Sequence, residues 1–164
     1  MLYYPKIPGS ASVPFSRGIA FEKYDGTNLH WVWNRDIGWH AFGTRRDEFN
    51  LTDQGVVAFS RKHTHLKDSV VIFRDELADG LEQIFRQNPS YLEFQDLIVF
   101  TEFFGPNSFA GLHKVNDTKQ LRLLDVSAEL YGFIGPKQFV EDFGPLPIAR
   151  VVYEGKITGK FTED

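Results

Sequence analysis

The alternation of apolar and polar positions predicts β-strands in the first and last parts of the chain. In residues 27–34, one face carries the large apolar side chains of Leu29, Trp31 and Trp33. Alternate side chains of a strand share a face, so this segment is a strand with one buried side. Comparable patterns, or continuous apolar runs, predict strands over 17–23, 27–34, 38–44, 97–104, 119–126 and 148–154.

The first three of these strands are separated by short turn segments. Asp25-Gly26 lies between two β-prone stretches, and this dipeptide is a strong hairpin signal. Residues 34–38 form the next turn. We therefore predict an antiparallel meander, with Lys23 near one end of it.

A helix is predicted from Ser69 onward. Its apolar positions recur at helical spacing, Ser69 can cap its start, and Asn88-Pro89 stops it. The apolar positions are Val70, Phe73, Leu77, Leu81 and Ile84. A second, short helix is predicted over 136–143, and no element is assigned to 45–68. Residues 1–16 are rich in Pro, Gly and Ser and predict an irregular lead-in.

Composition narrows the class of protein. The chain has 164 residues, enough for one domain over 1–164, and the whole pattern predicts an α+β fold of antiparallel β-sheets with flanking helices. The absence of cysteine excludes disulfides and a thiol nucleophile. We find no signal-peptide pattern and no long apolar run, which predicts a soluble, cytoplasmic protein with no membrane partner.

The formal net charge of −4 does not predict nucleic-acid binding. Phosphate binding depends on local clusters of Lys and Arg, and two occur here, Arg45-Arg46 and Arg61-Lys62-His63. A nucleic-acid contact would therefore be a local patch.

Two charged residues stand in apolar surroundings. Lys23 follows an apolar strand and precedes Tyr24, and limited hydration disfavours the ammonium form and lowers the pKa of a lysine. Such a lysine can act as a nucleophile. Glu102 shares a strand face with apolar residues and needs a partner there if it is ionised.

The order Lys23-Tyr24-Asp25-Gly26-Thr27-Asn28 resembles motif I of the covalent nucleotidyltransferases. With Glu22 in front of it, the string is most similar to the RNA ligases that seal nicks in duplex RNA. The resemblance implies that Lys23 attacks the α-phosphate of ATP with Mg²⁺ present, carries AMP, and passes it to a 5′-phosphate. The implied partners are ATP and RNA ends or nicks, and the implied role is RNA repair.

Three later segments resemble further motifs of that family. Gly43-Thr44-Arg45-Arg46 fits motif Ia, with Arg45 holding a phosphate or ribose oxygen. Residues 99–105 fit motif III, with Glu102 accepting from the ribose hydroxyls. Leu123-Leu124-Asp125-Val126 fits motif IIIa, where Leu124 stands in place of the aromatic that stacks on adenine.

The resemblance also implies roles close to Lys23. The main chain of Glu22 reads the adenine edge, and Asp25 and Asn28 orient the lysine, a metal or the ribose. Two downstream motifs complete the family's domain. Residues 154–157 superficially fit the first of them but come too soon after Glu102, so we expect both beyond Asp164. The chain then corresponds to a C-terminally incomplete adenylation domain.

Each residue also has a purely structural interpretation. Arg45-Arg46 can be a solvated loop pair, Glu102 can pair with Arg122, and Asp125 can cap a strand. His63-Thr64-His65 is interpreted as a polar loop and not as a metal site. Two other functions stay open: a capping-type guanylyltransferase that uses GTP, and an inactive module that binds nucleotide or RNA.

Overall fold

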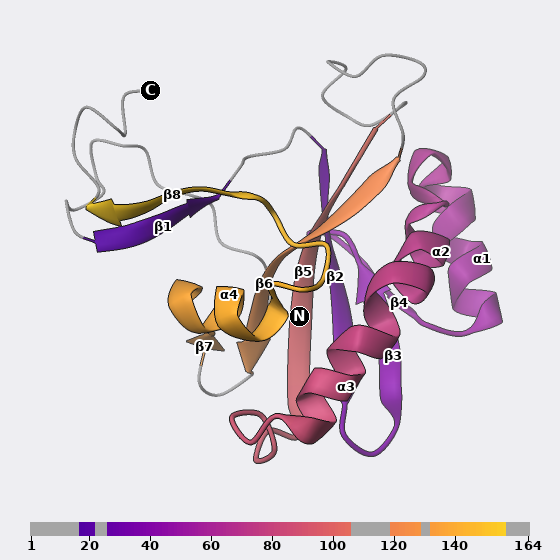
Figure 1. Ribbon diagram of the computed structural model, residues 1–164. Helices are drawn as coiled ribbons and strands as arrows, with labels where there is room; N and C mark the ends of the chain where they lie inside the picture. The colour runs from indigo at the N-terminus through magenta and orange to yellow at the C-terminus, as the bar shows by residue number, and fades with distance from the viewer. Residues whose placement is uncertain (1–16, 22–25, 106–118, 129–131, 157–164) are drawn as a thin grey trace.

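The computed structural model describes residues 17–21, 26–105, 119–128 and 132–156. Within them lie two antiparallel sheets and several helices (Figure 1). The strands are β1 (Arg17–Phe21), β2 (Thr27–Asn34), β3 (Gly38–Gly43), β4 (Glu48–Asn50), β5 (Asp96–Phe104), β6 (Gln120–Ala128), β7 (Gly132–Phe133) and β8 (Val151–Lys156). The helices are α1 (Asp53–Lys62), the 3₁₀ turn η2 (Thr64–Leu66), α2 (Ser69–Phe73), the π-helical turn η3 (Arg74–Ala78), α3 (Asp79–Gln87) and α4 (Pro136–Phe143). The predicted α+β class with antiparallel sheets and flanking helices is confirmed.

The larger sheet has the strand order β4-β3-β2-β5-β6-β7 in the described part of the chain. A ladder without register shifts joins β2 to β5, from Thr27 opposite Phe103 to Asn34 opposite Asp96. The predicted strands over 27–34, 38–44, 97–104 and 119–126 all belong to this sheet and differ from the prediction by at most two residues at either end.

The predicted meander is wrong at its first step. β1 pairs with β8 in a separate two-stranded sheet, whereas β2 pairs with β3 and β5. The Asp25-Gly26 signal predicts that β1 pairs with β2. Both edges of β2 are instead paired, with β3 and β5, and this tertiary pairing overrides the local turn propensity. Residues 22–25, including Lys23, lie outside the described residues.

Aromatic packing holds the helices against the sheet. Leu29, Trp31 and Trp33 are fully buried, as the alternation predicts. The Trp31 ring stacks on Phe73 of α2 at a centroid distance of 4.0 Å, and its indole N–H donates to Thr101 Oγ1 at 2.9 Å. A tryptophan can be buried completely when its ring stacks on another aromatic ring and its indole N–H has a hydrogen-bond acceptor.

The predicted long helix is present over 69–87, but it is not uniform. Its middle turn, η3, is π-helical, and Val70, Phe73, Leu77, Leu81 and Phe85 are buried along it. The predicted cap at Ser69 is wrong, because Ser69 is the first helical residue and its hydroxyl donates to the Leu66 carbonyl at 2.7 Å. Asp68 holds the N-cap position without a side-chain cap bond.

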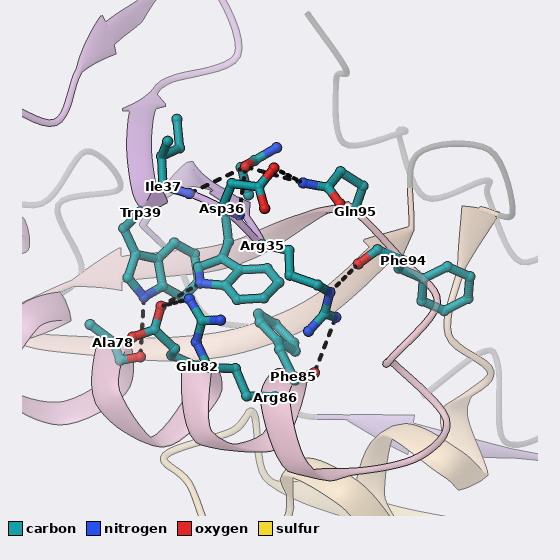
Figure 2. Close-up of polar contacts among 12 residues, drawn as sticks. Arg35, Asp36, Ile37, Trp39, Ala78, Glu82, Phe85, Arg86, Phe94 and Gln95 are labelled. Atoms are coloured by element: carbon teal, nitrogen blue, oxygen red, sulfur yellow. Dashed lines mark hydrogen bonds and ion pairs between the residues drawn. The ribbon is translucent and has the colours of Figure 1, made fainter.

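At the β2–β3 turn, arginines and tryptophans tie the sheet to α3 (Figure 2). Arg35 donates to three carbonyls at and just beyond the end of α3, those of Phe85, Tyr91 and Phe94. The indole N–H of Trp33 donates to Glu82 at 2.6 Å. The bond to Phe85 gives a partner to a carbonyl in the last turn of α3, where the helix leaves carbonyls unpaired. We interpret this end of the sheet as scaffold.

Residues 45–68, unassigned from the sequence, hold β4, α1 and η2. Thr52 caps α1 by accepting from the Gly55 N–H at 3.1 Å. Phe59 is the one fully buried side chain of α1, which explains why its apolar pattern is weak. Within the described ranges, no helix combines the length and apolar character that crossing a membrane requires.

The Trp31–Phe73 stack gives a test of this packing. We expect Phe73→Ala to lower the free energy of unfolding by about 3–5 kcal/mol, because it leaves a cavity under a buried tryptophan. Val71, on the same helix, is 60% exposed, so Val71→Ala should change it by less than about 0.5 kcal/mol. Urea unfolding of the two variants measures the difference, and equal losses would contradict this account of the core.

Candidate functional site

The register of β2 and β5 brings two polar residues to one end of the large sheet. Asn28 lies directly opposite Glu102. Gly26, just before β2, runs so close to β5 that a Cβ there would lie 2.1 Å from the Phe103 carbonyl oxygen. Glycine is therefore required at residue 26 by close backbone approach, in addition to any role in a turn.

The segment after β3 folds back on itself and carries two arginines. A Cβ on Gly43 would lie 2.1 Å from the Asp47 carbonyl oxygen, so this close return also needs glycine. The Thr44 hydroxyl donates to Asp47 at 2.6 Å and accepts from the Arg46 N–H at 3.2 Å. Arg45 and Arg46 are exposed on the resulting turn, and neither has an ion-pair partner among the described residues.

Asp47 joins this turn to the end of α1. One carboxylate oxygen accepts from Thr44, and the other accepts from His63 Nε2 at 2.8 Å and from Lys62 Nζ at 2.9 Å. Burial alone would raise the pKa of Asp47, but the bonds from Thr44, Lys62 and His63 outweigh it and hold the pKa well below its ordinary value. The carboxylate is therefore ionised and locks His63 to the arginine turn.

These segments line an open pocket of about 440 Å³. Residues 26–28 and Glu102 contribute from the strand ends, residues 44–46 from the turn, and His63, His65 and Leu66 from the end of α1 and from η2. The volume falls within the range of about 300–1,000 Å³ typical of small-molecule sites. Arginine and histidine on two sides and one carboxylate give it a mixed lining in which cationic groups predominate.

Of the residues singled out from the sequence, Asn28, Arg45 and Glu102 line this pocket together. Leu124 lies in β6 and is not among the pocket-lining residues of the described chain. Glu22, Lys23 and Asp25 lie outside the described residues, and Gly26, the next residue in the sequence, lines the pocket.

Arg122 and Asp125, the two residues named in the purely structural interpretations of Glu102 and of the strand end, both lie in β6. Arg122 lies opposite Glu102 in the β5–β6 ladder, while its guanidinium donates to Gln120 at 3.1 Å. Asp125 lies inside β6, next to a register shift, and its carboxylate accepts from the Val126 N–H at 3.0 Å. It is therefore not a strand-end cap.

Sequence reasoning missed His63, His65 and Asp47 as members of the site. The sequence pattern predicts a polar loop at His63-Thr64-His65; in the structure His63 ends α1 and both histidines line the pocket. No group of three or more potential ligating side chains that could hold a metal occurs within the described ranges. Spacing alone gave no signal, because the His63–Asp47 bond joins residues sixteen positions apart.

No family model matches the chain, and no curated protein matches it. Among solved structures, the chain is similar to an apo mutant of the RNA ligase R4a of Naegleria gruberi, with a TM-score of 0.44 and 14% sequence identity. The similarity covers 88% of this chain and 36% of that one, so the chain spans about a third of that protein's length.

The Asp47 junction predicts a pH-dependent stability. A carboxyl with a lowered pKa in the folded state stabilises the fold above its ordinary pKa, 3.8 for Asp47, and this contribution is lost as pH falls toward the lowered value. We expect Asp47→Asn to lower the free energy of unfolding by about 1–3 kcal/mol at neutral pH. The difference from the unmodified chain should shrink below about pH 4.

Urea unfolding at a series of pH values measures this difference. Asp75→Asn is the matched control, because Asp75 is exposed in the helical turn η3 and should show little change. A pH-independent loss in Asp47→Asn would show that the charge of Asp47 is not what stabilises the junction.

Proposed function

We propose that this chain is the adenylation-domain part of an ATP-dependent RNA ligase in which Lys23 becomes covalently linked to AMP. The observation that carries the proposal is the meeting of Asn28, Arg45 and Glu102 around one pocket, whose wall includes Gly26, three positions after Lys23 in the sequence. These residues come from three separate segments that were selected by motif order alone. A motif gains weight when its members converge in space.

The pocket chemistry suits a nucleotide. The guanidinium of Arg45 can form paired, charge-assisted hydrogen bonds with phosphate oxygens, and its positive charge disfavours protonation of a nearby lysine. The Glu102 carboxylate can accept from ribose hydroxyls, and the Asn28 amide can both donate and accept. Leu124 does not line the pocket in the described part of the chain, so no contact with the adenine ring is assigned to it. Glu22 would act through its main chain, and Asp25 would orient the lysine, a metal or the ribose.

The proposed reaction has three steps. The neutral amine of Lys23 attacks the α-phosphorus of ATP, so that a nitrogen–phosphorus bond forms and the bond to pyrophosphate breaks. AMP then passes to the 5′-phosphate of an RNA strand, and a 3′-hydroxyl displaces AMP to form the phosphodiester. Mg²⁺ is commonly held by substrate phosphates and one or two carboxylates, for which Asp25 and Glu102 are candidates.

Covalent labelling tests the nucleophile. With ATP radiolabelled at the α-phosphate and Mg²⁺, we expect the unmodified chain to acquire label and Lys23→Ala to acquire none, because the bond-forming amine is gone. Lys137→Ala, which removes an exposed lysine on α4, should be labelled like the unmodified chain.

Gel autoradiography and the mass of the labelled peptide identify the site. Label that persists in Lys23→Ala, or an unmodified chain that ATP does not label, would contradict the proposal. Labelling by GTP in place of ATP would favour a capping-type guanylyltransferase.

Two variants test the pocket itself. Loss of a hydrogen bond to a charged group costs about 1.5–3 kcal/mol, so Arg45→Ala and Glu102→Gln should each weaken ATP-dependent labelling about tenfold to a hundredfold. Initial rates over a range of ATP concentrations measure the effect.

The matched controls are Arg61→Ala, on the exposed side of α1, and Glu76→Gln, exposed in η3. Both should keep the rate of the unmodified chain. If the controls lose as much as the pocket variants, the pocket is not the nucleotide site.

A further inference from the structure

Residues of η2 line both the pocket and a second hollow. Thr64, His65, Lys67 and Lys119 line this hollow, whose volume is about 560 Å³. His65 lines both the pocket and the hollow, so the two are adjacent across this one side chain. A ligand longer than a nucleotide could therefore contact both.

The surface that joins the two spaces is rich in cationic side chains. Arg46, His65 and Lys67 are exposed, and neither Arg46 nor Lys67 has an ion-pair partner among the described residues. Lys119 forms an ion pair with Asp68, which offsets part of the charge. In a chain with a formal charge of −4, this local excess of cations favours a polyanion at this surface.

The side chains present also indicate how the polyanion is contacted. Of the large apolar side chains that are exposed in the described segments, Phe133 is the one aromatic, and it lies in β7. Base recognition in single strands relies on aromatic stacking. The Arg, His and Lys side chains of this surface suit contacts with the sugar-phosphate backbone, which position a strand and carry no sequence information directly.

We propose that Arg46, His65, Lys67 and Lys119 form a basic turn surface that binds the phosphate backbone of the RNA strand whose 5′-phosphate enters the pocket. This inference rests on the proposed function for the identity of the strand. The pocket holds the reacting end, and the basic turn surface holds the nucleotides next to it. His65 stands where the two meet.

Binding of a nicked RNA duplex in the absence of ATP tests this surface. The probe is a fluorescent RNA duplex with a 5′-phosphate at the nick, and fluorescence anisotropy reports its affinity at about 50 mM salt. We expect Lys67→Glu to bind at least about tenfold more weakly than the unmodified chain. Lys137→Glu, which makes the same change on α4, should bind like the unmodified chain.

The salt dependence gives a second readout. Lys67→Ala should reduce the slope of log affinity against log salt by about one, as expected for one lost phosphate contact. Thermal melts of both Lys67 variants check that they are folded. Equal affinities for Lys67→Glu and Lys137→Glu would overturn the surface, and tighter binding of a DNA duplex of the same sequence would overturn the choice of RNA.

Failure of this inference and failure of the proposed function give different results. RNA binding that depends on Lys67, in a chain that ATP does not label, would keep the surface and remove the adenylation reaction. Labelling of Lys23 together with RNA binding that is indifferent to Lys67 would keep the reaction and remove the surface.

Discussion

The pairing of β2 with β5 is the constraint on which the rest of the structure depends. In this register Leu29, Trp31 and Trp33 are buried, and Asn28 lies opposite Glu102 at the strand ends. A shift of one residue would turn every β2 side chain to the opposite face and expose the tryptophans. The free energy gained by burying the core therefore also holds Asn28 and Glu102 opposite each other at the pocket. This wall of the pocket needs no further interaction to bring the two residues together.

The other edge of the pocket is assembled by charge. The Asp47 carboxylate connects the arginine turn to the end of α1 through Thr44, Lys62 and His63. Charge-assisted hydrogen bonds are stronger than neutral ones and more directional than apolar contacts. The pocket thus combines one wall fixed by packing with one fixed by a partly buried carboxylate, and both walls present polar groups to the same space.

The sequence predicted the parts of the fold whose pattern is strong. β2, β5 and the helical stretch 69–87 have clear periodicity, because each buries one face. β4 is three residues long and α1 buries Phe59 alone, so neither has a pattern to detect. β1 pairs with β8, which is distant in the sequence. The Asp25-Gly26 signal depends only on neighbouring residues, and it therefore predicted the wrong partner for β1. At the site, motif order selected Asn28, Arg45 and Glu102, whereas Asp47 and His63 become partners through tertiary folding alone.

The small sheet of β1 and β8 has a consequence for the segment that leads into residue 22. An isolated pair of strands is marginally stable in water, so this sheet depends on contacts with the rest of the molecule. One such contact is the edge-on packing of Phe21 against Phe139 of α4, with ring centroids 5.9 Å apart. Local opening of β1 therefore costs less free energy than opening of β2, and it also breaks the contact between Phe21 and Phe139 of α4. The backbone on the two sides of residues 22–25 thus belongs to regions of unequal local stability.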